Sequence, residues 1–222
     1  MAAETNIDTV LFDLDGTIID TNELIIESFL HALKDIVPEA FGREQIIPYM
    51  GMTLVYQMQQ FSGREQVEDL VRAYREYNLR RHDEMVTLFP GVAEAVSALK
   101  ERGFRLGVVT TKMRDSTDRA LRLLGIRSAM DVIVTLDDVE HPKPHPEPVL
   151  KAIAALGANP SATVMLGDSA ADIQSAASAG AIPVGVAWSL KGEAVLREAG
   201  AKHVVQDMRQ LLTLCGWEKM PG

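Results

Sequence analysis

Two aspartates, Asp13 and Asp15, stand one residue apart at the end of an apolar run and are followed by Gly-Thr. Side chains alternate along a strand, so both carboxylates can face one site at its carboxyl end, where open α/β sheets bind ligands. Two adjacent carboxylates repel each other unless a cation or a shared proton offsets their charge. The pair therefore predicts a nucleophile and an acid/base beside a hard divalent metal ion. A strand followed by a turn and a helix cap uses the same residue types, so the rest of the chain must decide.

Two further segments offer polar side chains at predicted loop positions. Thr110, Thr111 and Lys112 follow the strand that we expect over residues 104–109, although threonine is also common at ordinary strand ends. Lys143 lies in a segment in which every second residue is proline, at positions 142, 144 and 146. We expect these prolines to hold the backbone extended and to orient the lysine side chain.

Another pair of carboxylates, Asp168 and Asp172, lies where an expected strand over 163–166 leads into a helix. A separation of four residues can place both on one side of the first helical turn. The alternative is that they are N-terminal acids favoured by the helix dipole, which suits Asp172 better than Asp168. His141 and His145 flank Lys143, but two histidines without further ligands are weak evidence for a metal site.

Composition limits the class of protein. The chain has 222 residues, a net charge of −9 and one cysteine, Cys215, which cannot form an intrachain disulfide and which we interpret as a packed thiol. Basic residues form no long block, which argues against a nucleic-acid partner. We see no leader segment and no apolar run long enough to cross a membrane. The composition predicts a soluble, cytoplasmic protein that needs locally placed cations if it binds phosphate.

The order of elements predicts an α/β fold. Strand-like runs over 104–109, 131–136, 163–166 and 182–187 alternate with helix-like segments, which is typical of a parallel sheet covered by helices on both faces. Residues 22–83 lack a clear strand, and their apolar residues recur at helical spacing. We interpret them as a helical insertion after the first strand.

Four motifs, taken in chain order, resemble those of the haloacid dehalogenase superfamily, and the resemblance covers nearly the whole chain. They are Asp13-x-Asp15-Gly16-Thr17, Thr110, Lys143 and Gly167-Asp168-Ser169-x-x-Asp172. The resemblance implies a doubly wound, Rossmann-like parallel-sheet core over residues 1–20 and 84–222, with a small helical cap over 21–83. It also implies a Mg²⁺-dependent phosphatase that works through an aspartyl-phosphate.

The resemblance assigns roles to the motif residues. Asp13 is the expected nucleophile, and Asp15 the expected acid/base. Thr110, Thr111 and Lys112 are expected to bind phosphate or substrate, and Lys143 to neutralise charge in the transition state. One Mg²⁺ ion is expected, with Asp15 contributing its backbone carbonyl. Its expected ligand residues are Asp13, Asp15, Asp168 and Asp172.

Three segments that are less specific than the catalytic motifs resemble a branch of bacterial pyrophosphatases within this superfamily, with phosphoglycolate phosphatase as a near neighbour. They span residues 21–31, 134–141 and 186–192. That resemblance implies hydrolysis of pyrophosphate and a functional link to the kinase/phosphorylase of the phosphocarrier HPr. Alternatives are a phosphatase for phosphoglycolate or other small phosphomonoesters, a sugar phosphomutase, and a non-enzymatic binding protein. The phosphomutases usually carry His where Ile25 stands, and a binding protein should have lost a catalytic acid or Lys143, so we disfavour both.

Overall fold

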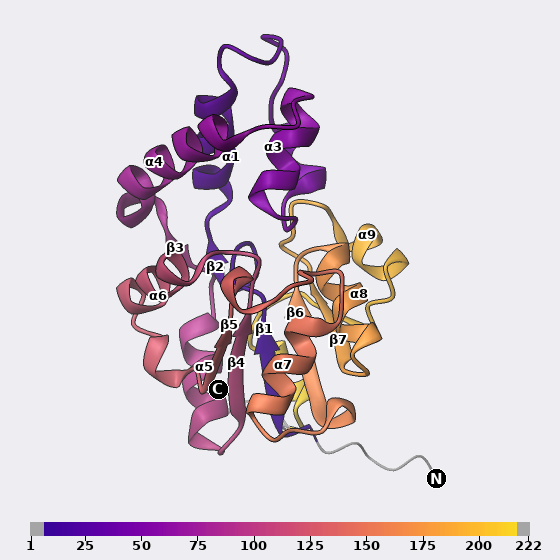
Figure 1. The fold of residues 1–222 in the computed structure, drawn as a ribbon. Helices are drawn as coiled ribbons and strands as arrows, with labels where there is room; N and C mark the ends of the chain where they lie inside the picture. Colours follow the sequence, from indigo (N-terminus) through magenta and orange to yellow (C-terminus); the bar gives the residue numbers. More distant parts are fainter. Residues whose placement is uncertain (1–6, 217–222) are drawn as a thin grey trace.

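A computed structural model describes residues 7–216 and shows a parallel six-stranded sheet beneath a group of helices (Figure 1). The strand order is β5-β4-β1-β6-β7-β8. The chain leaves the central strand β1 toward β4 and β5, and then returns to the other side of β1 with β6. This is the predicted doubly wound α/β fold, and its switch point lies beside β1.

The elements are as follows. The strands are β1 (Thr9–Phe12), β2 (Ile19–Asp20), β3 (Thr87–Leu88), β4 (Arg105–Val109), β5 (Val132–Val134), β6 (Thr163–Gly167), β7 (Ile182–Val186) and β8 (His203–Val205). The α-helices are α1 (Asn22–Leu33), α2 (Arg43–Ile46), α3 (Leu54–Ser62), α4 (Glu68–Met85), α5 (Val92–Glu101), α6 (Arg114–Leu123), α7 (Glu147–Ala155), α8 (Ala170–Ser178), α9 (Glu193–Glu198) and α10 (Gln210–Leu214). Short 3₁₀ turns are η1 (Ile47–Tyr49), η2 (Arg127–Ala129), η3 (Leu136–Asp138) and η4 (Pro160–Ala162).

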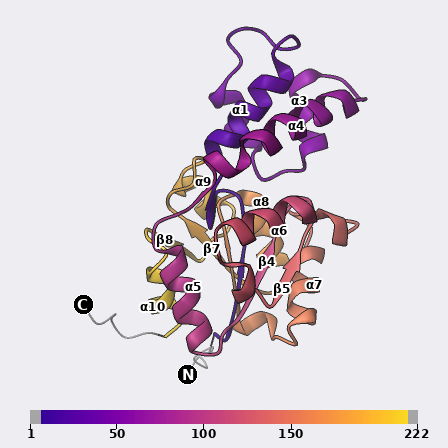
Figure 2. The same ribbon diagram turned by 90° about the vertical axis from the view of Figure 1, so that its left-hand side faces the viewer.

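The alternation of side chains along β1 sorts the core into two layers. Val10 and Phe12 pack with residues of α5, α6 and α10 on one face of the sheet, and Leu11 packs with α7 and α8 on the other. Figure 2 shows α5 and α7 on opposite sides of the strands. A strand that is buried on both faces reads as a continuous apolar run, and this explains why the β1 segment has no polar alternation.

Helices α1 to α4 follow β2 in the chain and form what we call the helical module. Its apolar residues make a core separate from those of the sheet, centred on Phe29, which packs edge-to-face on Phe61 at 5.2 Å between ring centroids. The two short strands β2 and β3 pair antiparallel where the chain enters and leaves the module. The module therefore lies on a two-stranded connection over the carboxyl end of the sheet (Figures 1 and 2).

Several element boundaries differ from those that the sequence suggested. Strand β5 ends at Val134, because the backbone N–H and the hydroxyl of Thr135 both donate to Asp138 and start a 3₁₀ turn. Helix α8 begins at Ala170, because Ser169 and Asp172 form a capping box. Asp168 consequently precedes the helix and does not lie on its first turn. Strand β8 was not anticipated. Among the described helices, none has the length and hydropathy needed to span a bilayer.

Candidate active site

The predicted site residues come from the carboxyl ends of three adjacent strands. Asp13 follows β1, Thr110 follows β4 and Asp168 follows β6. Since β4 and β6 flank β1 on opposite sides, these ends meet at the switch point of the sheet, where α/β folds form ligand sites. The tertiary fold thus brings together residues that lie up to 155 positions apart in the chain: Asp13 and Asp168 are both buried at this edge.

Lys143 is the centre of a buried network. Its Nζ donates to Asp13 Oδ1 at 2.6 Å, to Asp172 Oδ1 at 2.5 Å and to the carbonyl of Val109 at 2.9 Å. The Lys143 side chain is 2% exposed and that of Asp13 is 9% exposed. Buried charges need partners with good geometry, and this ammonium uses all three of its donors on oxygen acceptors. The lysine therefore holds the Asp13 carboxylate in one orientation.

Lys191, which sequence reasoning missed, pairs with Asp168. Its Nζ lies 2.6 Å from Asp168 Oδ2, and both side chains are almost fully buried. Lys191 comes from the loop after β7, the strand next to β6. The available signal was its place just beyond the end of a predicted strand, in the 186–192 segment that resembles the pyrophosphatases.

Burial and charge act against each other in this network. Burial raises the pKa of Asp13, and the Lys143 ammonium opposes that rise. Burial alone would lower the pKa of Lys143, but the charges of Asp13 and Asp172 raise it above its ordinary value. Burial likewise raises the pKa of Asp168, against the effect of Lys191. The carboxylates therefore depend on nearby cations to stay ionised.

Asp15 lies at the mouth of the site. Its Oδ1 accepts from the Thr21 hydroxyl at 2.8 Å and from Lys112 Nζ at 2.9 Å. The Lys112 side chain is only 13% exposed, so it is not a freely solvated surface lysine. The Thr110 hydroxyl accepts the N–H of Lys112 at 3.1 Å, which folds this loop back toward β4. The Thr111 hydroxyl instead donates to the carbonyl of Gly51 in the helical module at 3.2 Å.

The loop that carries Lys143 is a turn, and the expectation of an extended segment was wrong. The N–H of His145 donates to the carbonyl of Pro142 at 3.0 Å. The Ser175 hydroxyl on α8 donates to the carbonyl of His145 at 2.8 Å and ties the turn to the core. The turn sends Lys143 inward and leaves His141 and His145 exposed on the outside.

The acidic residues fit a hard divalent cation. Asp13, Asp168 and Asp172 offer carboxylate oxygens that all lie within 4.8 Å of one another, and all three residues are buried. Gly16 closes the same corner: a Cβ added there would lie 2.8 Å from Asp168 Oδ2, so only glycine leaves the carboxylate its room. Buried oxygen ligands in this number, with room for water, match the preference of Mg²⁺.

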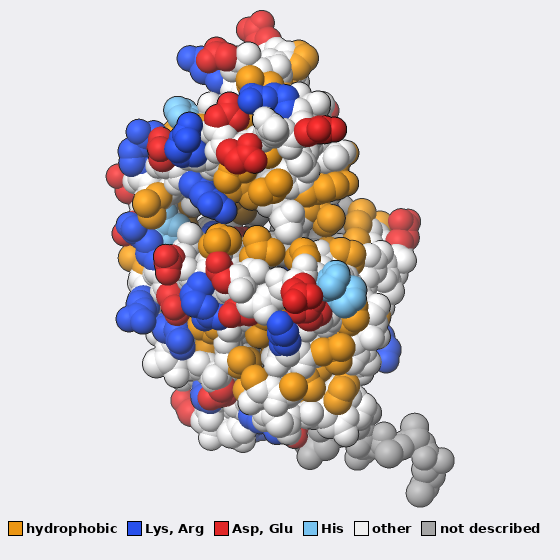
Figure 3. All heavy atoms as spheres, in the orientation of Figure 1, with side chains coloured by type: hydrophobic (Ala, Val, Ile, Leu, Met, Phe, Trp, Pro, Cys, Tyr) orange, Lys and Arg blue, Asp and Glu red, His pale blue; other side chains and the backbone are white. Residues whose placement is uncertain are grey.

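A cavity of about 670 Å³ lies between the helical module and the sheet edge that carries Asp13 and Asp15. The space-filling view shows hydrophobic side chains gathered along the seam between the two parts (Figure 3). The loop around Gly51 reaches the core, since a Cβ at Gly51 would lie 2.9 Å from Ser169 Oγ. On the module side of the cavity, Gln57 Oε1 and His82 Nε2 are buried without a hydrogen-bond partner among the described residues.

Comparison with known proteins places this arrangement in a family. Residues 10–186 match the profile of the haloacid dehalogenase-like hydrolases. The chain belongs to that family. The match spans the predicted motifs from β1 to the end of β7, so the family resemblance and the doubly wound fold that the sequence predicted are both confirmed.

Relatives within the family are similar over almost their full length. The chain is 43% identical to pyrophosphatase PpaX of Bacillus velezensis over 215 residues, which cover 96% of this chain and 98% of that protein. It is 44% identical to pyrophosphatase PpaX of Bacillus pumilus with the same coverage. Among solved structures, a predicted phosphoglycolate phosphatase from Haemophilus somnus superposes with a TM-score of 0.81 at 25% identity, covering 96% of this chain and 99% of the other. A hydrolase from Pseudomonas syringae has a TM-score of 0.83 at 26% identity, with 93% and 96% covered.

Proposed function

We propose that this hydrolase is a Mg²⁺-dependent inorganic pyrophosphatase that works through a phosphoenzyme on Asp13. The observation that carries the proposal is the buried Asp13 carboxylate held at 2.6 Å by Lys143, beside a cluster of oxygen ligands and at the floor of an open cavity. The similarity to proteins named pyrophosphatase PpaX over 96% of the chain supports the choice of substrate. We further propose that residues 21–83 are a cap over a core of 1–20 and 84–222, and that the protein is cytoplasmic.

In the proposed reaction, an Asp13 oxygen attacks one phosphorus while the bond from that phosphorus to the bridging oxygen breaks. Asp15 gives its proton to the departing phosphate and then takes one from the water that attacks the phosphoenzyme, which releases Asp13 and the second phosphate. Lys143 offsets negative charge on the transferring group, and the hydroxyl of Thr110 with the backbone N–H of Thr111 orients it. A Mg²⁺ ion held by Asp13, the Asp15 carbonyl, Asp168 and Asp172 would supply further positive charge at the transferring oxygens.

Lys112 is our candidate for recognition of the departing phosphate. Its Nζ lies within 3.2 Å of both Asp15 carboxylate oxygens, where the leaving group would receive its proton. The link to the HPr kinase/phosphorylase, whose reverse reaction yields pyrophosphate, stays a prediction from the resemblance.

The second candidate is a phosphatase for phosphoglycolate or another small phosphomonoester. The cavity favours a larger phosphomonoester over phosphoglycolate, because about 670 Å³ exceeds what either pyrophosphate or the similarly sized phosphoglycolate would fill, and the walls include apolar Ile25, Met52 and Leu54. A sugar phosphomutase remains disfavoured, since Ile25 lies on this wall where those enzymes usually carry His.

Phosphate release should be measured in parallel from pyrophosphate, phosphoglycolate and sugar phosphates, with and without Mg²⁺. We expect the highest kcat/KM with pyrophosphate and no turnover without the ion. A preference for phosphoglycolate would favour the second candidate. Lack of release from every substrate would contradict the proposed hydrolase activity.

A further inference from the structure

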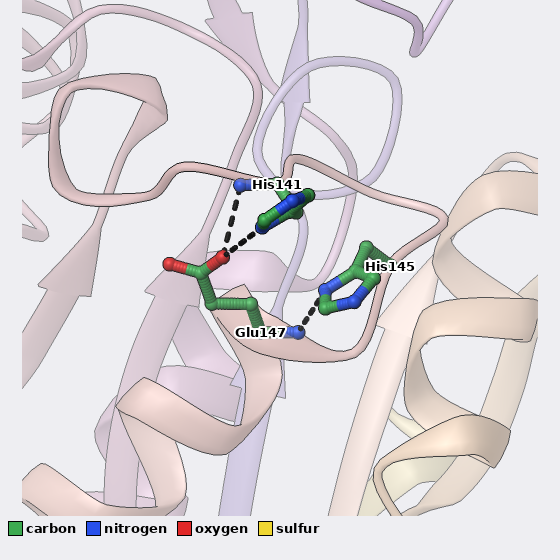
Figure 4. A group of neighbouring side chains, drawn as sticks. All are labelled: His141, His145 and Glu147. Atoms are coloured by element: carbon green, nitrogen blue, oxygen red, sulfur yellow. Dashed lines mark hydrogen bonds and ion pairs between the residues drawn. The ribbon is translucent and has the colours of Figure 1, made fainter.

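A second group of metal-ligating side chains lies outside the aspartate site, on the outer side of the Lys143 turn. His141, His145 and Glu147 each offer a ligand atom, and these atoms lie within 4.8 Å of one another (Figure 4). The two imidazole rings face each other at 4.8 Å between centroids and 35° between planes. The sequence showed only the two histidines; the fold adds the carboxylate that they lacked.

The distances suit a small transition-metal ion. His141 Nδ1 lies 3.1 Å from Glu147 Oε2. Two ligand atoms that are each about 2.0 Å from a tetrahedral ion are about 3.3 Å apart. The distance between His141 Nδ1 and Glu147 Oε2 therefore needs little adjustment to hold such an ion. Two imidazoles and one carboxylate, with a fourth position open to water, are a donor set that Zn²⁺ accepts and Mg²⁺ does not favour. The group is therefore chemically distinct from the all-oxygen aspartate cluster.

Contacts around Glu147 hold its carboxylate in place. Oε1 accepts the N–H of Glu140 at 3.0 Å and pairs with Lys151 at 3.0 Å, while Oε2 accepts the N–H of His141 at 2.9 Å. The bond from Lys151 and these backbone donors lower the pKa of Glu147 to about 2, so the ligand is anionic at neutral pH. Supporting contacts of this kind orient ligands and tune metal affinity.

Each imidazole presents its Nδ1 to Glu147. His145 Nδ1 accepts the N–H of Glu147 at 3.2 Å, so this nitrogen is unprotonated, and a metal ion would have to replace the backbone donor at its lone pair. His141 Nδ1 is hydrogen-bonded to the Glu147 carboxylate, and a metal ion bound at Nδ1 would require the tautomer that carries its proton on Nε2. The N–H of Glu147, at the start of α7, would then turn to water.

We propose that His141, His145 and Glu147 form a zinc-type transition-metal site on the Lys143 turn. The two histidines stand two residues before and two residues after Lys143, so a bound ion clamps the turn that presents this lysine to Asp13. The proposal does not depend on which phosphate compound the aspartate site hydrolyses.

Zinc binding to the full-length protein tests the proposal by calorimetry in excess Mg²⁺, which keeps the aspartate cluster filled. We expect one Zn²⁺ per chain in this background. His141→Ala, His145→Ala and Glu147→Gln should each weaken binding by at least about tenfold. His203→Ala replaces an exposed histidine of β8 and should leave the affinity unchanged. Mg²⁺-dependent turnover in zinc-free buffer should be the same for the His141 and His145 variants as for the unmodified chain, which shows that they fold.

Co²⁺ provides a spectroscopic check, since tetrahedral coordination by histidine gives visible absorption bands. These bands should appear with the unmodified chain in excess Mg²⁺ and vanish in both His→Ala variants. No Zn²⁺ binding beyond the Mg²⁺-filled site, or binding with equal affinity in the His141 and His145 variants, overturns the proposal.

Discussion

The two walls of the cavity differ in how well their polar atoms are satisfied. On the sheet side, Asp13 lines the cavity and shares Lys143 with Asp172, and Asp168, which does not line it, is paired with Lys191, all at distances of 2.5–2.6 Å. On the module side, Gln57 Oε1 and His82 Nε2 are buried with no hydrogen-bond partner among the described residues.

A buried polar atom without a partner costs roughly 1–3 kcal/mol, so native proteins retain few of them outside functional sites. The sheet side is complete before a substrate arrives and is suited to chemistry that is common to many phosphate substrates. The module side presents acceptor atoms and apolar surface that water or a bound molecule must complete. We therefore expect most sheet-side substitutions to change the rate with every phosphate substrate, and module-side substitutions to change which substrate is preferred. Lys112 is the sheet-side exception, because we propose that it meets the departing phosphate.

The largest effect should come from Asp13→Asn. Loss of the nucleophile should reduce turnover by about 10⁴-fold or more while the fold survives, because the amide keeps the size and Lys143 keeps Asp172 as an anionic partner. Steady-state kinetics and ¹⁹F NMR of beryllium fluoride trapped on Asp13 measure this. Asp35→Asn, on an exposed residue of the module, is the control. Near-normal turnover by Asp13→Asn would refute the mechanism.

Removal of Mg²⁺ should also abolish activity. Three carboxylates and one carbonyl fill at most four of the six positions around Mg²⁺ and leave the rest to water, so a chelator should strip the ion and excess Mg²⁺ should restore turnover. Ca²⁺ should support turnover poorly, because its looser and higher coordination spoils in-line geometry. Activity assays with each ion test this, and full turnover in metal-free buffer would contradict it.

Lys191→Met should destabilise the metal-free protein. It leaves Asp168 buried without its cation, and breaking one side of a buried pair costs about 3 kcal/mol. Chemical unfolding with and without Mg²⁺ measures the change. We expect Mg²⁺ to recover part of the loss, because the ion supplies positive charge to the same carboxylate. Lys202→Met is the exposed control. An unchanged free energy of unfolding would mean that the Lys191–Asp168 pair adds nothing to stability.

Lys112→Met should discriminate between substrates. Turnover of pyrophosphate should fall more than that of an aryl phosphate, whose leaving group carries little charge. The differential loss should be about 1.5–3 kcal/mol, the scale of a charged hydrogen bond. The ratio of kcat/KM values measures it, with Lys34→Met as a control on an exposed residue. Equal losses on both substrates would show that Lys112 acts only through Asp15, and would leave the module as the source of pyrophosphate recognition.

Arg75→Met should have the smallest effect. Arg75 lies on the module wall of the cavity but is exposed, so its attraction for an anionic substrate is about 0.2–1 kcal/mol. We expect KM for pyrophosphate to rise by roughly up to fivefold with kcat unchanged. Arg72→Met is matched to it, since Arg72 lies on the same helix and both arginines line a second surface pocket, but only Arg75 also lines the cavity. A large fall in kcat would contradict the expectation that the module wall affects substrate binding and the sheet wall affects the rate.

Most of the sheet side was predictable from the sequence, because three of its motifs directly follow a strand. Asp13, Thr110 and Asp168 stand where an apolar run ends, and parallel strands place their carboxyl ends at one edge. Lys191 was missed because its partner is 23 positions away and their contact requires β6 and β7 to be neighbours. Strand β8 has only three residues, which is too short for a clear pattern.

The sequence alone determined the class of fold, the helical nature of residues 22–83 and the chemical types available to the site, since these depend on local periodicity and on residues beside strand ends. Tertiary structure decided which charges meet, where the cavity lies and what completes it. Glu147 joins the two histidines only because a turn folds back onto the start of α7, and Gln57 and His82 share one cavity wall only because α3 and α4 pack together. The first arrangement depends on the path of a turn and the second on the distance between two helices, and the pattern of residue types gives neither.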